Sequence, residues 1–315
     1  MRFRDKVKKP RRPVVVYEIL PPREQDGTLS SYAERISSLL SQTHIDAINI
    51  PEVHDEEGRG NRPVQNQLRA EPREFGRLLQ DNVGVEAIVN RVVVHEPMAA
   101  QQQWLKETYY DYGIDNLVIV GGESHETSYP GPGVTESSRY ITRELNGNRF
   151  DYFCGGIAIP SRKAESRRLL EKSRHGIEFF TSQVLYDSKK IRKVLGHYQQ
   201  RCDAEGTFPR RILLSFAPVS SPKNVEFLKW LGVEIPAKTE KYLLEAPDEM
   251  AQRSTEIASG IMREILDHVS KAGLRVPIGL NVEHIMSYNF QASITMLQEL
   301  ARDYREFCIR TNLYG

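Results

Sequence analysis

A glutamate stands near the end of an apolar stretch at the start of the chain. Residues 13–23 read PVVVYEILPPR, so Glu18 follows a run of β-branched residues. Such a run is typical of a buried strand, and Pro21-Pro22 ends it because proline cannot donate to a ladder. A buried carboxyl group needs an ion-pair partner or a proton. Glu18 is therefore either half of a structural ion pair, for example with Arg23, or a proton donor or base whose pKa burial raises.

Polar residues also stand at the C-terminal ends of other apolar stretches. They are Asn49, Asn90, Arg91, Glu123, Ser124, Arg162, Gln183, Tyr186, Ser215, Glu283 and His284. In an α/β barrel such strand ends meet at one mouth, where the chemistry of these folds takes place. Polar groups at nearly every strand end are what a ligand-lined mouth requires. The alternative is that they simply meet solvent in the loops.

Eight apolar stretches of strand length alternate with segments of helical periodicity. The predicted strands fall near residues 13–20, 45–51, 83–94, 117–120, 150–160, 176–186, 211–216 and 277–282. This count predicts the α/β class and a single (β/α)8 TIM barrel that spans residues 13–315. A doubly wound sheet is the alternative. It is weakened because no G-x-G-x-x-G motif follows an early strand.

Residues 1–12, MRFRDKVKKPRR, form a short basic extension before the first predicted strand. The segment lacks the apolar core of a signal peptide. We expect a frayed tail, with an electrostatic clip for an acidic ligand or membrane as the second interpretation.

The composition argues against several classes of protein. Lys and Arg number 43 against 42 Asp and Glu, so the net charge of +1 gives no sign of nucleic-acid binding. No apolar run approaches the roughly 20 residues that span a bilayer. Cys154, Cys202 and Cys308 are odd in number and lack metal spacing, which indicates free thiols in a reducing cytoplasm. The eight histidines form no i, i+4 pair, so we expect no metal site.

The strand ends match the motifs of one enzyme family in order and spacing. Residues 17–23 are similar to F-E-x-x-P-P-[KR], and residues 172–187 follow K-x-x-A-G-A-x-x-x-x-T-Q-x-x-[FY]-D. Segments similar to the family's R-G-D, A-x-Y-P-E, P-[IV]-x-[SN] and V-x-I-P occur at residues 121–123, 157–161, 218–221 and 233–236. Over residues 13–300 the chain thus resembles methylenetetrahydrofolate reductase, a (β/α)8 barrel that reduces 5,10-methylenetetrahydrofolate to 5-methyltetrahydrofolate with a nicotinamide cofactor.

The resemblance implies roles for five of these residues. Glu18 would be the acid that protonates N10, which opens the five-membered ring to the N5-iminium that accepts hydride. Gln183 would hydrogen-bond the pterin, and Glu123 would stand where the family has an aspartate at the pterin. Tyr186 and Asn289 complete the set implied for the substrate. Tetrahydrofolate derivatives are the expected ligands, and the resemblance leaves a homo-oligomer open.

The cofactor side departs further from the family pattern. The resemblance places six residues there: Asn90, Arg91, Gly122, Ile159, Arg162 and Lys172. Ile159 replaces a tyrosine, and residues 90–92, NRV, replace H-L-T. We expect FAD, with Lys172 and the Gly-rich turn at its phosphates, and NAD(P)H as the hydride source. Direct hydride transfer without flavin, known among relatives of the family, is the alternative.

Two further hypotheses compete with this interpretation. One is a barrel oxidoreductase that acts on a related pterin. The other is a folate-binding subunit without catalysis, which has little use for a buried acid such as Glu18.

Overall fold

The computed structural model describes residues 1–54, 61–64, 67–122 and 127–311, and in it eight parallel strands form a closed barrel. The strand order around the barrel follows the chain, β1 to β8, and β8 pairs with β1. The strands are β1 (Val15–Ile19), β2 (Ala47–Ile50), β3 (Glu86–Val92), β4 (Asn116–Val120), β5 (Phe153–Ala158), β6 (Phe179–Ser182), β7 (Arg211–Phe216) and β8 (Ile278–His284). The predicted (β/α)8 barrel is confirmed, and the doubly wound alternative is wrong.

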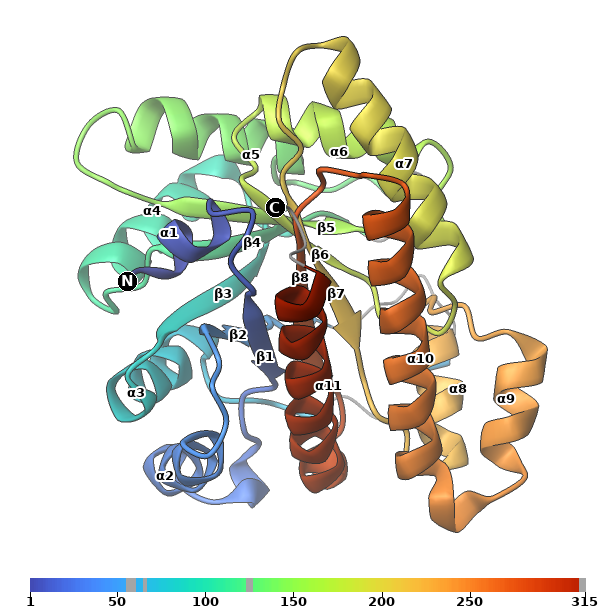
Figure 1. The fold of residues 1–315 in the computed structure, drawn as a ribbon. Coiled ribbons are helices and arrows are strands. Elements are labelled where there is room, and N and C mark those ends of the chain that lie inside the picture. Colours follow the sequence, from blue (N-terminus) through green and yellow to red (C-terminus); the bar gives the residue numbers. More distant parts are fainter. Residues whose placement is uncertain (55–60, 65–66, 123–126, 312–315) are drawn as a thin grey trace.

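Helices surround the barrel and cover its outer face (Figure 1). They are α1 (Phe3–Val7), α2 (Leu29–Leu40), α3 (Pro72–Val83), α4 (Met98–Tyr110), α5 (Val134–Tyr140) with a π-helical turn over Ile141–Leu145, α6 (Glu165–Arg174), α7 (Lys189–Ala204), α8 (Pro222–Trp230), α9 (Ala237–Leu244), α10 (Met250–Lys271) and α11 (Phe290–Thr311). The sequence periodicity predicts two helices between β7 and β8, over residues 222–231 and 246–272. The structure adds α9 between them, and α10 begins four residues later than predicted.

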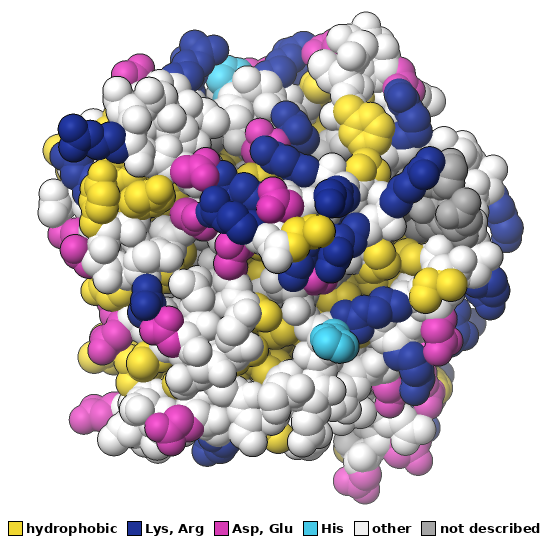
Figure 2. Space-filling model, turned by 60° about the vertical axis from the view of Figure 1, so that its left-hand side comes forward, with side chains coloured by type: hydrophobic (Ala, Val, Ile, Leu, Met, Phe, Trp, Pro, Cys, Tyr) yellow, Lys and Arg dark blue, Asp and Glu magenta, His cyan; other side chains and the backbone are white. Residues whose placement is uncertain are grey.

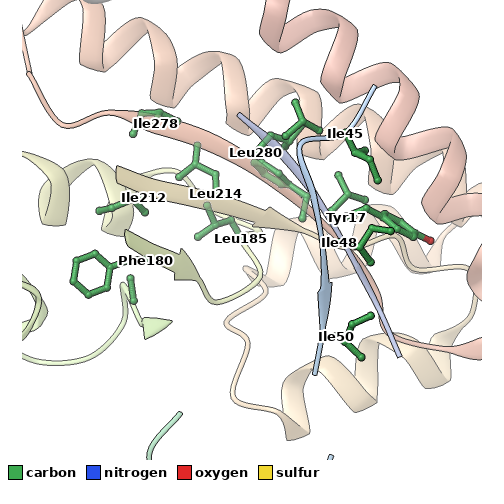
Figure 3. Packing of buried hydrophobic residues seen from close by; sticks show 14 of the residues in the cluster. Tyr17, Ile45, Ile48, Ile50, Phe180, Leu185, Ile212, Leu214, Ile278 and Leu280 are labelled. Carbon is green, nitrogen blue, oxygen red and sulfur yellow. The ribbon is translucent and has the colours of Figure 1, made fainter. Parts of the chain in front are cut away.

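Side chains of β1 alternate between two environments, as the period of a strand requires. Val15, Tyr17 and Ile19 face outward into the main core between strands and helices. Figure 3 shows Tyr17 in this layer among Ile45, Ile48 and Leu280, and its hydroxyl is 2.7 Å from Ser293 Oγ on α11. Val16 belongs instead to the smaller cluster inside the barrel. Glu18 has the parity of Val16 and therefore points inward, at the end of the strand.

The barrel interior changes from apolar to polar along the strands. At the N-terminal end it is filled by residues such as Val16, Ala47, Ile88, Phe179 and Leu213. Two positions further along the same strands stand Glu18, Asn49, Asn90, Thr181 and Ser215. The alternation of each strand thus places the polar strand ends on one level, at the mouth of the barrel.

The basic N-terminal segment closes the opposite end of the barrel. Phe3 is 1% exposed and packs edge-on against Phe153 and Phe179, with ring centroids 6.1 and 5.5 Å away. Ion pairs hold the charged side chains on the surface, among them Lys6 with Asp46 at 3.0 Å. The expectation of a frayed tail is therefore wrong for residues 3–7, because two apolar residues in a basic segment suffice to bury a helix turn.

Arg211 at the start of β7 fixes this segment from inside the barrel. Its side chain is 2% exposed, and its guanidinium donates to the carbonyls of Val7 (3.1 Å), Lys9 (2.6 Å) and Pro10 (3.3 Å). It also donates to the carbonyl of Ile278 on β8. Four neutral acceptors thus compensate a buried cation.

The surface carries charges of both signs. On the face in Figure 2, Lys and Arg side chains alternate with Asp and Glu side chains. The three cysteines are free thiols, as predicted. Across the described ranges, no helix combines the length and the apolar character that crossing a membrane needs.

Candidate active site

A cavity of about 350 Å³ opens at the C-terminal ends of the strands. Its floor and walls come from several strand ends and from the loops and helix that follow them. The lining includes Glu18, Asn90, Val120, Gly122, Ile157, Ile159, Thr181, Gln183 and Glu283, with Phe227 and Trp230 from α8. The volume suits a small organic ligand and lies at the lower end of such pockets.

Glu18 lies at the floor of this cavity without a cationic partner among its hydrogen bonds. It accepts from Asn49 Nδ2 at 2.5 Å and from Asn281 Nδ2 at 3.5 Å. Arg23, considered above as a partner, pairs instead with Asp26 at 2.7 Å. Burial raises the pKa of Glu18 to about 7, and the two amide donors oppose this only in part. Glu18 can therefore hold or release a proton near neutral pH.

Glu283 of β8 places a second carboxyl group beside Glu18. The two residues are register partners of neighbouring strands. Burial and the charge of Glu18 raise the pKa of Glu283 well above its usual range. Glu283 stands at a predicted strand end, but no motif of the sequence implies a role for it. Its position could have identified it. Glu283 lies two and four residues after Asn281 and Gly279 on β8, so all three face the barrel interior.

Gln183 and Asn90 line the cavity at two other strand ends. Gln183 Nε2 donates to the carbonyl of Leu231 at the end of α8, 3.0 Å away. Asn90 is 7% exposed, and its Oδ1 is a buried acceptor that no donor of the described residues reaches. A ligand N–H can satisfy such an acceptor, because a buried polar atom otherwise costs free energy.

Arg91 points away from the cavity, although it follows Asn90 directly. Odd and even positions of a strand face opposite sides, so Arg91 faces the outer layer. There it pairs with Glu52 and Glu96, both at 2.6 Å, and stacks on Trp104 with 4.7 Å between the guanidinium carbon and the ring centroid. Arg91 is committed to these contacts, and the structure gives it no position at the cavity.

Tyr186 and Asn289 also lie outside the cavity lining. The Tyr186 hydroxyl donates to the carbonyl of Ala217 at 2.9 Å within a buried apolar cluster. Asn289 is 2% exposed and bonds Asn224 Oδ1 (2.9 Å) and the carbonyl of Pro218 (3.2 Å). Tyr186 joins the segments after β6 and β7, and Asn289 joins those after β7 and β8, which accounts for their presence near the mouth without a ligand contact.

A group of cations lies behind the end of β5. Lys172 Nζ donates to the carbonyl of Ile157 at 2.6 Å. Burial lowers the pKa of Lys172 to about 8; Glu165 opposes this, while Arg162 and Arg168 lower it further. Arg168 was not expected here. Its Nε is buried, and no acceptor in the described part of the chain reaches it. Three cations against one carboxylate can accept an anionic group.

Of the remaining positions assigned from the sequence, two lie at the cavity and one lies outside the described residues. Gly122 and Ile159 line the cavity, whereas Glu123 lies outside the described residues. A Cβ on Gly122 would fall 2.3 Å from a ring carbon of Tyr129, so the backbone passes this ring too closely for a side chain. No group of three or more His, Cys, Asp or Glu among the described residues could hold a metal ion.

An aromatic wall closes one side of the cavity. Phe227 and Trp230 of α8 stack with ring centroids 5.7 Å apart and an interplanar angle of 16°. The Arg62 guanidinium lies over both rings, 5.5 and 5.2 Å from their centroids. Arg69 also lines the cavity and donates to the carbonyl of Pro21 at 2.7 Å. A flat ring system with an anionic end is the ligand class that such a wall accommodates.

Comparison with known proteins gives a family and a fold. The family model of methylenetetrahydrofolate reductase matches residues 2–301. A solved structure described as an uncharacterized protein from Clostridium thermocellum that binds two copies of 5-methyl-5,6,7,8-tetrahydrofolic acid is 20% identical, with a TM-score of 0.76, over 95% of this chain and 98% of that chain. A solved structure of 2,3-dimethylmalate lyase is 11% identical over 96% of this chain and 97% of that chain, with a TM-score of 0.45. No curated protein matched the chain.

Proposed function

The chain belongs to the methylenetetrahydrofolate reductase family, and from this premise we propose that it interconverts 5,10-methylenetetrahydrofolate and 5-methyltetrahydrofolate with NAD(P)H as the hydride donor or acceptor. The observation that carries the proposal is the partly buried Glu18 at the cavity floor, which has no cationic hydrogen-bond partner among the described residues and whose pKa of about 7 allows both proton states near neutral pH.

Reduction needs a proton at N10 and a hydride at the one-carbon unit. Glu18 in its acid form gives its proton to N10, the bond between N10 and the methylene carbon breaks, and the electron pair stays on N10. The N5-iminium cation then accepts the hydride and becomes the N5-methyl group. Oxidation runs the same steps backward, so Glu18 must then act as a base.

The cavity walls support a folate as the occupant. The pterin has several N–H donors and ring acceptors, and Asn90 Oδ1 and the Gln183 amide stand at the lining to meet them. The Phe227–Trp230 wall suits the aminobenzoyl ring, and Arg62 and Arg69 suit the glutamate tail. The Clostridium thermocellum structure, which binds 5-methyltetrahydrofolic acid, supports the same class of ligand.

The cation group behind β5 fits a phosphate-bearing cofactor. Lys172, Arg162 and the unexpected Arg168 would hold the phosphates of FAD. When bound, the flavin would relay hydride between nicotinamide and folate. The same cations would serve the diphosphate of NAD(P)H if the protein works without flavin, while Arg91 serves neither because it is paired elsewhere.

An absorption spectrum of the purified protein and a turnover assay test this proposal together. We expect oxidation of NADH or NADPH that depends on 5,10-methylenetetrahydrofolate. Flavin bands in the same preparation would support the relay, and turnover by a colourless protein would support direct transfer. Tight folate binding without turnover under any reductant would contradict the proposed reaction and favour a binding subunit.

Replacement of Lys172 by methionine tests the cofactor group. We expect the bound flavin per protein molecule to fall at least about tenfold, because a buried charge-assisted contact to phosphate is worth roughly 1.5–3 kcal/mol. The measurement is flavin absorbance after dialysis. Replacement of the exposed Lys223 by methionine serves as the matched control, and unchanged flavin content in the Lys172 variant would contradict the assignment.

Replacement of Gln183 by alanine tests the pterin contact. The KM for 5,10-methylenetetrahydrofolate should rise about tenfold, since the loss of one or two hydrogen bonds costs on the order of 1–2 kcal/mol. The exposed Gln252 on α10 gives the control variant, Gln252→Ala. A KM equal to that of the control would remove Gln183 from the folate site.

A further inference from the structure

Two carboxyl groups share one amide donor inside the barrel mouth. Asn281 Nδ2 lies 3.3 Å from Glu283 Oε1 and 3.5 Å from Glu18 Oε2. The same nitrogen lies 3.0 Å from Ser215 Oγ and 3.3 Å from Thr181 Oγ1. An amide nitrogen has two hydrogens, so it cannot donate to four acceptors at once. The four acceptors must therefore share two hydrogens, and the two carboxyl groups do not each receive a full hydrogen bond from Asn281.

Among the described residues, no cation is a hydrogen-bond partner of the two carboxyl groups. The hydrogen bonds of Glu18 and Glu283 within the described chain come from Asn49, Asn281 and Ser215. The other charged or titratable groups of the cavity lining are Glu52, His54, Arg62, Arg69, His95 and His284. His54 pairs with Glu52 at 3.3 Å, and Arg69 donates to a backbone carbonyl. Two ionised carboxylates at this place would repel each other in a site that water reaches poorly.

We propose that Glu18 and Glu283 hold one proton between them at neutral pH, and that Glu283 is a positioning residue that keeps Glu18 in its acid form. The inference rests on the proposed function for its role in catalysis, but the shared proton is a property of the protein without ligands. Burial raises the pKa of both groups, and the charge of Glu18 raises the pKa of Glu283 further, which agrees with the geometry.

The pair also explains how the cationic intermediate is accommodated. After Glu18 has given its proton to N10, both carboxylates are ionised and face the positive charge of the N5-iminium. Their repulsion is then offset by that cation. Hydride from the reduced nicotinamide neutralises the iminium, and Glu18 takes up a proton from solvent to restore the pair. The charge needed for the intermediate is thus provided by Glu283, a group that does not itself donate the proton.

A carboxyl titration followed by NMR tests the shared proton directly. Protein with 13C-labelled glutamate side chains is titrated without ligands, and Glu18→Gln and Glu283→Gln identify the two signals. In the wild type we expect two coupled steps, both above the usual range of a glutamate, with one proton left on the pair between them. In Glu283→Gln the Glu18 step should move down by at least about one pH unit. A wild-type titration in which both groups ionise together below pH 5 would overturn the proposal without any variant.

The pH dependence of turnover gives the second arm. With Glu283→Gln the alkaline limb of kcat/KM for reduction should shift to lower pH by the same amount, and Glu283→Asp should restore it in part. The exposed Glu299 on α11 supplies the control variant Glu299→Gln. An unchanged titration in Glu283→Gln rejects the pair whatever the activity. A shifted titration in a protein that turns over no folate retains the pair and rejects the proposed function.

Discussion

Replacement of Glu18 by glutamine will lower kcat for the reduction of 5,10-methylenetetrahydrofolate by at least about 100-fold, because general acid catalysis contributes about 10² to 10⁴. Glutamine keeps the size of the side chain and can still bond Asn49 and Asn281, but it has no proton to give to N10. Folate affinity and cofactor content should change little. Stopped-flow or steady-state oxidation of NAD(P)H measures the loss, and binding by calorimetry checks that the site is intact.

The pH dependence of the reaction tests the acid role of Glu18 more specifically than a loss of activity does. Since the pKa of Glu18 is raised to about 7, the acid form is present below that pH and is lost above it. The reduction rate should therefore fall as pH rises through about 7. Oxidation of 5-methyltetrahydrofolate needs the base form and should rise over the same range. Glu18→Gln activity within threefold of wild type, or parallel profiles in the two directions, would exclude Glu18 as the acid.

Replacement of Arg211 by methionine will lower the free energy of unfolding by about 3 kcal/mol, the scale of a buried truncation that leaves polar groups unpaired. The carbonyls of Val7, Lys9 and Pro10 lose the Arg211 donor, and the carbonyl of Ile278 keeps the Tyr304 hydroxyl, 2.9 Å away. Urea unfolding followed by circular dichroism measures the change.

Two controls make the Arg211 result specific. Arg302 on α11 is exposed, and Arg302→Met should shift the free energy of unfolding by less than about 0.5 kcal/mol. Turnover per folded molecule should stay near that of wild type in Arg211→Met, since Arg211 lies at the end of the barrel opposite the cavity. A variant as stable as the wild type would mean that the hydrogen bonds of Arg211 contribute no net stability.

The barrel could be predicted from the sequence because each strand is marked locally. Runs such as residues 14–16 and 117–120, bounded by polar or Gly residues, indicate buried strands without knowledge of their neighbours. Helix α3 is an example of clear end signals. Pro72 stands at its first turn, the Glu71 side chain caps it, and Gly84 ends it with φ +74°. Helix α9 was missed because it is short and lies in a crossover between two longer helices.

The site could be predicted only in part. Whether a residue lines the cavity depends on which side of its strand it faces and on which strands pair with one another. Asn90 and Arg91 are adjacent and equally polar, yet only Asn90 has the inward parity of Ile88. Glu283 gained its importance from β8 closing onto β1, which brings together residues 265 positions apart. No local pattern reports such a pairing. Tyr186 and Asn289 match family motifs but stabilise loops through contacts that only the fold defines.

The hydrogen bonds between Arg211 and the N-terminal segment can form only late in the synthesis of the chain. Val7 is made before its partner, because the donor that bonds its carbonyl comes 204 residues later. At roughly 5–20 residues per second, that donor is made about 10–40 s after its acceptor. During that interval Phe3 and Val7 stay exposed to solvent, and chaperones can bind them. Residues 3–7 therefore reach their final contacts only after most of the barrel has been made.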